Sequence, residues 1–147
     1  MLVEDKRTEK FCSFFVSEFH LEMILMPYIN KKIEEKENII IATEKNLEKT
    51  VEELISKVNL KEENKQKILN LSWNKSEIND IKNNSNIIII GTKNYIKKIN
   101  QNIEEMNINK INIVDCYDFE EVKEEMIEII KTHDKSLNTL GIKESLD

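Results

Sequence analysis

The strongest constraint on the fold of this chain is a pair of apolar runs that lack polar alternation. One is NIIIIGT at residues 86–92, with four consecutive isoleucines, and the other is KINIVDCY at residues 110–117. A strand with one face in water alternates apolar and polar side chains, whereas a strand covered on both faces is apolar throughout. Strands of the second kind are typical of parallel sheets, in which right-handed crossover helices cover both faces. The two runs therefore predict an α/β protein.

Segments with the helical spacing of apolar residues separate the predicted strands. Clear strands are expected at residues 11–17, 38–43, 86–92 and 110–117. Amphipathic helices are expected at residues 18–36, 47–58, 93–106 and 118–133, where apolar side chains recur every three or four positions. This alternation predicts a Rossmann-like three-layer α/β/α sandwich with four or five mainly parallel strands.

The stretch from residue 61 to residue 82 has two interpretations. KILNLSW at residues 67–73 can form a third strand, followed by a short helix at 75–82 that Ser76 caps. The alternative is a helix that runs through Gln66 to Leu71. The chain from 1 to 147 is predicted to be a single domain, and residues 134–147 form a loose or docking C-terminal tail with Gly141 as a helix stop or turn.

Charge and cysteine content limit the classes of partner and the compartment. The chain has 22 Lys and Arg against 28 Asp and Glu, a net charge of -6, which argues against a nucleic-acid interface. No apolar stretch approaches the roughly 20 residues of a membrane span, and the polar N-terminus is not a signal peptide. Two cysteines do not make a disulfide framework, so a reducing, cytoplasmic location is expected. The wealth of Ile, Lys, Asn and Glu fits a bacterial protein from an AT-rich genome.

The carboxyl ends of the predicted strands are where a ligand site is expected. In open parallel sheets, ligands bind outside these ends, at the point where the strand order reverses. Glu44, Gly91 and Asp118 are among the residues at these ends. The candidate ligand-binding residues are Ser17, Glu18, His20, Thr43, Trp73, Thr92, Lys93, Asp115 and Cys116.

The turn GTKN at residues 91–94 lacks the glycines of a phosphate-binding loop. Such a loop needs several glycines so that consecutive backbone N–H groups can turn toward an anion, and this turn has one. Gly91 as the flexible turn residue and Thr92 as the helix N-cap explain the stretch. Lys93 as an anion contact is the alternative.

The first turn, VSEFHLE at residues 16–22, also lacks glycine. Ser17 as N-cap and Glu18 in the first turn suit the positive end of a helix dipole, and a carboxylate there repels phosphate. The layout of strand, helix, strand and helix is similar to that of RecA-like sensor domains without a phosphate loop. This similarity of layout, which no motif supports, implies at most a nucleotide or small-molecule binder.

No catalytic, metal or cofactor site is predicted. His20 is either a base, a phosphate contact or an ordinary half-buried histidine, and His133 suits the end of the last helix. Cys116 precedes a helix N-terminus, which can lower a thiol pKa, but nearby acidic residues oppose that shift and a buried inert thiol is the alternative. The histidines and cysteines do not form a metal-binding pattern. Asp118 and Glu121 have the spacing of a capping box for the last helix.

Three classes of function remain open. The first is a non-catalytic regulatory or protein-interaction module, with a protein partner or a homodimer. The second is a small-molecule or nucleotide-binding domain that uses the carboxyl ends of the strands. The third is an enzyme that works through Cys116 or His20, which is the least favoured because no catalytic motif is present.

Overall fold

The computed structural model describes residues 8–144. The strands are β1 (Thr8–Phe15), β2 (Asn38–Thr43), β3 (Ser85–Gly91), β4 (Ile111–Asp118), β5 (Lys135–Asn138) and β6 (Gly141–Glu144). The helices are α1 (Glu18–Glu34), α2 (Glu48–Ile55), α3 (Glu62–Leu69), α4 (Lys93–Glu105), α5 (Phe119–Val122) and α6 (Met126–Lys131). Strands and helices therefore alternate along most of the chain, as the apolar pattern predicts.

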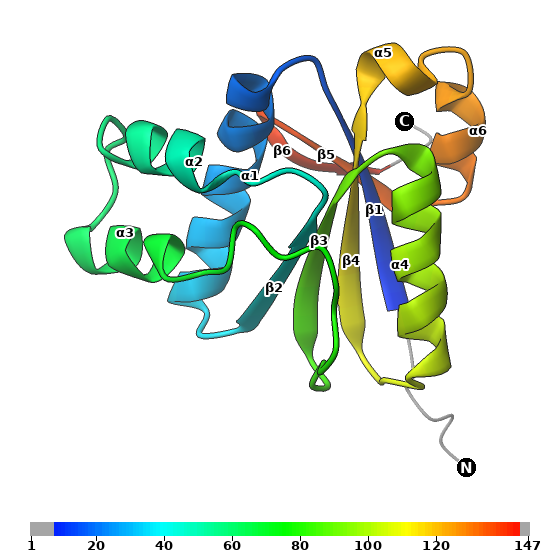
Figure 1. The fold of residues 1–147 in the computed structure, drawn as a ribbon, viewed down its shortest axis with the longest axis horizontal. Coiled ribbons are helices and arrows are strands. Elements are labelled where there is room, and N and C mark those ends of the chain that lie inside the picture. Colours follow the sequence, from blue (N-terminus) through cyan, green and yellow to red (C-terminus); the bar gives the residue numbers. More distant parts are fainter. Residues whose placement is uncertain (1–7, 145–147) are drawn as a thin grey trace.

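The strands form one sheet with the order β2-β3-β4-β1-β5-β6 (Figure 1). All neighbouring pairs are parallel except β5 and β6, which form an antiparallel hairpin. The chain is thus an α/β protein with a mostly parallel sheet of six strands, where four or five were predicted. The hairpin accounts for the difference, because its short strands carry too few apolar residues for a strand pattern.

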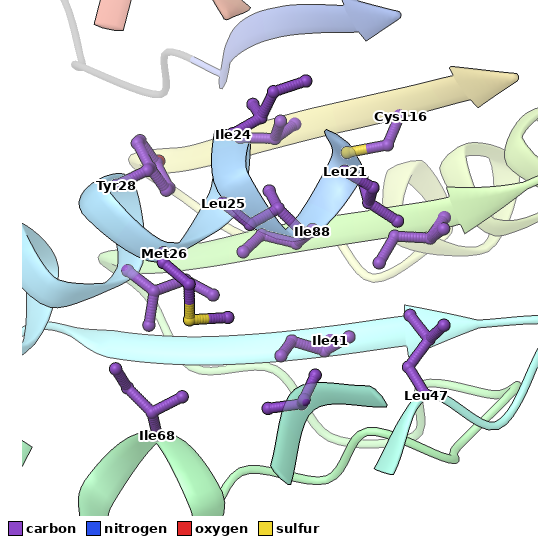
Figure 2. Close-up of a cluster of buried hydrophobic side chains, with 14 of the residues drawn as sticks. Leu21, Ile24, Leu25, Met26, Tyr28, Ile41, Leu47, Ile68, Ile88 and Cys116 are labelled. Carbon is purple, nitrogen blue, oxygen red and sulfur yellow. The ribbon is translucent and has the colours of Figure 1, made fainter. Parts of the chain in front are cut away.

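Helices cover both faces of the sheet. One cluster of buried side chains joins α1, α2 and α3 to one face, and a second cluster joins α4, α5 and α6 to the other. In the first cluster, Leu25 of α1 lies beside Ile88 of β3 (Figure 2). Ile41 of β2 belongs to the same cluster. The strand β3 is central to both clusters, because Ile88 and Ile90 point to one face while Ile87 and Ile89 point to the other. The NIIIIGT run is therefore a strand covered on both sides, as predicted.

The prediction of a strand at residues 67–73 is wrong. Residues 62–69 form α3, and the chain then crosses the edge of the sheet without regular structure to β3 (Figure 1). The predicted helix capped by Ser76 is also absent from this described segment. The apolar residues that suggested a strand are anchors instead: Ile68 and Trp73 are buried in the first cluster, and the indole nitrogen of Trp73 donates to the Ile68 carbonyl at 2.8 Å.

Both ends of the described chain differ from the predicted boundaries. The first strand ends at Phe15 rather than at Ser17, which is the N-cap of α1. The helix predicted at 118–133 is divided into α5 and α6 by a turn. Within the segment predicted as a tail, β5 pairs with β1 and β6 pairs with β5, while residues 145–147 lie outside the described ones. Between residues 8 and 144, none of the helices is long and apolar enough to cross a membrane.

Candidate functional site

A pocket of about 300 Å³ lies at the carboxyl ends of β1, β2, β3 and β4. Its apolar lining comes from the end of β1, the first turns of α1, the segment before α2 and the end of β3. These side chains are Phe15, Leu21, Leu47 and Ile90. The helices that follow β1 and β2 pack on one face of the sheet, and those that follow β3 and β4 pack on the other. The pocket therefore lies where the chain divides between the two faces, as expected for an open α/β sheet.

Two carboxylates of the chain occupy the N-terminus of α4. Oε1 of Glu44 accepts a hydrogen bond from the backbone nitrogen of Thr92 at 2.7 Å, and Oε1 of Glu121 accepts one from the backbone nitrogen of Lys93 at 3.2 Å. Free N–H groups at a helix N-terminus attract anions. In phosphate-binding folds, a phosphate of the ligand accepts hydrogen bonds from such N–H groups. Here the carboxylates of Glu44 and Glu121 accept them instead.

Gly91 is required because of this close approach. A Cβ atom at position 91 would lie 2.6 Å from Oε1 of Glu44 and 2.5 Å from Cδ2 of Tyr95. The prediction that Gly91 serves as a flexible turn residue is wrong, because its φ is not positive and limited space favours glycine here. Thr92 is the predicted N-cap, since its hydroxyl accepts from the backbone nitrogen of Tyr95.

The turn after β1 is also closed by internal hydrogen bonds. The hydroxyl of Ser17 accepts from the backbone nitrogen of His20, and Nδ1 of His20 accepts from the backbone nitrogen of Val16 at 3.0 Å. Glu18 lines the pocket and contacts Nζ of Lys45 at 3.4 Å. Ser17 and His20 thus occupy two of the N–H groups at the start of α1 with acceptors of the chain itself.

The rim of the pocket is strongly acidic. Four carboxylates line it against the single ammonium of Lys45, and they are those of Glu18, Glu44, Asp118 and Glu121. Asp118 caps α5 by accepting from the backbone nitrogen of Glu120, whereas Glu121 contacts α4 instead of closing the predicted capping box. Each of these contacts uses only one oxygen of its carboxylate. The potential in the pocket is therefore favourable for cations and unfavourable for phosphates.

Asp115 and His133 form a buried pair away from this pocket. Nε2 of His133 lies 2.7 Å from Oδ2 of Asp115, and Nδ1 lies 2.7 Å from the carbonyl oxygen of Ile129. Nδ2 of Asn100 donates to the other Asp115 oxygen, and Nζ of Lys10 lies 3.5 Å from Asp115. Both imidazole nitrogens therefore face acceptors, and neither is directed toward a reactant as a general base must be. The pair ties the C-terminal end of α6 to the middle of β4.

Cys116 points into the core and not toward a helix N-terminus. Its side chain is buried in the first apolar cluster beside α1 (Figure 2). Burial raises the pKa of the Cys116 thiol well above its ordinary value, and the charge of Asp115 adds to the rise. Burial likewise raises the pKa of Cys12 to about 11. Both thiols are protonated at neutral pH, which leaves them without the thiolate that nucleophilic catalysis or metal binding requires.

Three of the nine candidate residues from the sequence lie together in the carboxyl-end pocket, namely Glu18, Thr43 and Thr92. The other six lie elsewhere: Ser17 and His20 in the cap of α1, Lys93 and Asp115 along a second pocket beside α4 and α6, and Trp73 and Cys116 in the core. Sequence reasoning did not identify the apolar lining or Lys45. A leucine or phenylalanine that lines a pocket has the same helical or strand spacing as one in the core, so no pattern distinguishes them.

Among residues 8–144, no group of three or more His, Cys, Asp or Glu side chains is arranged to hold a metal ion. No protein-family model, curated protein or solved structure matches the chain. The function must therefore be argued from the site itself.

Proposed function

We propose that this protein is a Rossmann-like three-layer α/β/α domain that acts as a non-catalytic cytoplasmic regulatory module by binding a small organic cation at the carboxyl ends of its strands. The observation that carries the proposal is the acidic rim around an apolar pocket of about 300 Å³. That volume is at the lower end of the roughly 300–1,000 Å³ range of small-molecule sites. The ligand class is an apolar body with an ammonium or amidinium group.

Several observations favour this ligand over a nucleotide. The N–H groups of Thr92 and Lys93 are held by internal carboxylates, so a phosphate would have to displace Glu44 or Glu121. It would also meet the repulsion of the other rim carboxylates. The RecA-like layout without a phosphate loop thus supports a domain that binds a ligand other than a nucleoside phosphate. Two buried free cysteines are compatible with a reducing compartment.

The test compares three small probes that share one apolar group. We expect 4-phenylbutylamine to bind, and 4-phenylbutanol and 4-phenylbutyrate to bind at least tenfold more weakly, in titrations followed by amide NMR shifts. The shifts should map to Thr43, Gly91 and Thr92. ATP with magnesium should bind no better than millimolar and should not be hydrolysed above background.

The matched variants are Glu18→Gln and Glu128→Gln. Glu18 lines the pocket, whereas Glu128 lies on α6 beside the other pocket. The first should weaken the amine at least fivefold and the second should not change it. Equal affinity for the amine and the carboxylate, or micromolar ATP binding, would contradict the proposed ligand class.

A protein-interaction module is a second candidate function. Its support is a set of exposed apolar side chains at the start of α1, namely Val16, Phe19 and Met23. Such side chains gathered over two helical turns are typical of interaction surfaces. A Phe19→Glu variant should lose any concentration-dependent increase in mass seen by light scattering, whereas Ile127→Glu, an exposed change on α6, should keep it.

A further inference from the structure

The outer edge of β2 carries backbone groups that no described residue pairs with. Along a strand, successive N–H and C=O groups point alternately to the two sides. The backbone nitrogen of Glu44 donates to the Ile90 carbonyl of β3, and the backbone nitrogen of Thr43 donates outward to Lys75 at 2.8 Å. The backbone N–H and C=O groups of Ile41 and Ile39, two and four residues before Thr43, therefore also point outward. Within residues 8–144, no backbone group forms a hydrogen bond with the outward N–H or C=O of either residue.

This edge lies in a groove of about 640 Å³. The floor is β2 at residues 39–41, one wall is residues 70–72 after α3, and the other wall is residues 75–80. The coil that links α3 to β3 produces both walls as it passes the end of β2 (Figure 1). The groove is distinct from the carboxyl-end pocket, with which it shares no residue.

The walls are fixed by contacts to the rest of the domain. The buried Trp73 anchors the turn between them, and its carbonyl accepts from the backbone nitrogen of Leu47 at 2.9 Å. The hydroxyl of Tyr95 donates to the carbonyl of Ser76 at 2.8 Å, and Ile78 is buried in the second apolar cluster. The walls of the groove are therefore held by contacts within the domain.

We propose that the groove binds an extended peptide segment of a partner protein, which adds to the sheet as a further strand beside β2. The backbone of the peptide would satisfy the outward N–H and C=O groups of Ile39 and Ile41, as in other cases of strand addition. Unpaired strand edges have this capacity, and proteins usually block it with short or charged edge strands. The opposite edge is of the blocked kind, since β6 has four residues that include Lys143 and Glu144.

The walls specify the side chains of the peptide. On an added strand, alternate side chains face opposite walls. Leu71 offers an apolar surface on one wall, whereas the other carries the two carboxylates of Glu77 and Asp80 against the one ammonium of Lys75. Within residues 8–144, neither Glu77 nor Asp80 forms an ion pair. The fitting sequence therefore alternates aliphatic and basic residues.

A second copy of this chain is a poorer occupant. If two β2 edges paired, the residues that line the groove in one copy would lie against those of the other copy. A peptide without flanking structure does not meet this obstacle. The expected partner is therefore a protein with an extended, exposed peptide segment.

The probe is a capped hexapeptide of alternating valine and lysine, titrated into the full chain and followed by amide NMR. We expect the Ile39 and Ile41 amides to shift and to become protected from hydrogen exchange, with no new protection at Ile40 or Ala42. Two further peptides carry N-methyl groups on all valines or on all lysines. One of these two should bind at least tenfold more weakly, because only one set of N–H groups can face β2 in a given strand direction.

Protein variants separate backbone pairing from charge. Ile39→Pro removes one outward N–H and should weaken the probe at least tenfold, while Ile39→Val should not. Glu77→Lys, on an exposed wall residue, should weaken it without altering the fold and serves if the proline variant does not fold. Equal binding of both N-methylated peptides, shifts confined to Gly91 and Thr92, or absence of binding at millimolar probe would each overturn the proposal. So would probe-free protection of Ile39 and Ile41 that rises with protein concentration, because a second copy would then fill the groove.

Discussion

The carboxylate of Glu44 accepts a hydrogen bond from the backbone nitrogen of Thr92, at 2.7 Å, across the carboxyl ends of two neighbouring strands. The bond places a negative charge at the N-terminus of α4, where the helix dipole favours it. It also links the end of β2 to the start of α4 through a contact that only the absence of a side chain at position 91 permits.

Replacing Gly91 by alanine should destabilise the domain by about 1–3 kcal/mol, because the new methyl group would displace Glu44 and press on Tyr95. Urea unfolding measures the cost. In a Glu44→Ala background the same replacement should cost less, because one of the two obstructing side chains is then absent. Strictly additive costs would show that Glu44 does not mediate the effect.

Removing either partner of the Asp115–His133 pair should cost about 3–5 kcal/mol, because a buried polar or charged group is then left without its partner. The relevant variants are Asp115→Ala, His133→Ala and the double variant, measured by urea unfolding. The double variant should be more stable than the sum of the two single costs predicts, with a coupling of about 0.5–3 kcal/mol. A coupling near zero would mean that the two side chains stabilise the fold independently.

The free energy of unfolding should decrease as pH rises and the buried carboxyl of Glu22 loses its proton. Glu22 is 2% exposed and its Oε2 lacks a hydrogen-bond partner among the described residues. Burial raises the pKa of Glu22 above its ordinary value, so the folded state binds the proton more tightly than the unfolded state. Glu22→Gln should therefore increase the melting temperature at pH 7, and the gain should disappear as pH falls below the ordinary pKa of a glutamate.

Glu37 should have the opposite effect to Glu22, because its pKa is lowered rather than raised. Its hydrogen bond from Asn86 Nδ2, at 2.9 Å, lowers the pKa of Glu37, and Lys32 adds to the effect. Its contribution to stability is present above the ordinary pKa and is lost as pH falls through the folded-state pKa. Glu37→Gln should accordingly lower the melting temperature at pH 7 and have little effect at pH 3. Parallel pH profiles for the two glutamine variants would contradict both assignments.

Ile89→Asp should unfold the domain, because a carboxylate would enter the fully buried layer between the sheet and α4. The expected cost exceeds about 4 kcal/mol, among the largest that single substitutions produce. Ile127→Asp is the matched control, since Ile127 is 70% exposed on α6, and its melting temperature should stay within about 2 °C of the parent. Circular dichroism during heating distinguishes the two results. A cooperative transition for Ile89→Asp at the parent temperature would be incompatible with the described sheet.

The sequence predicts the strands and helices in which a regular apolar pattern extends over the whole element. The strand β3 is buried on both faces, so its residues are apolar in an unbroken run. The helix α4 is buried on one face, so its apolar residues recur every three or four positions. Both patterns can be read from the sequence. The pattern at 67–73 misled for a physical reason: Ile68 and Trp73 are anchors at a helix end and a turn, and single anchors have no period. The hairpin of β5 and β6 is similarly too short and polar to detect.

The candidate site was predictable in position but not in chemistry. The rule that ligands bind at the carboxyl ends of parallel strands led to Thr43 and Thr92, which line a pocket, and ligand binding there stays a prediction. The hydrogen bond from Thr92 to Glu44 joins residues 48 positions apart, and the pair of Asp115 and His133 depends on how α6 turns back onto β4. Such contacts follow from the packing of whole elements, which one sequence does not encode in any local spacing.

The position of β1 inside the sheet has a consequence for how the chain is made. Thr8 of β1 pairs in register with Ile111 of β4, and the other side of β1 pairs with Lys135 and Ser136 of β5. During synthesis at roughly 5–20 residues per second, the first strand waits at least about 5 s before either neighbour is available. The strands β2, β3 and β4, which are consecutive in both sequence and sheet, can assemble during that interval. Of the strands from β1 to β4, β1 is therefore the one that waits longest for its neighbours in the sheet.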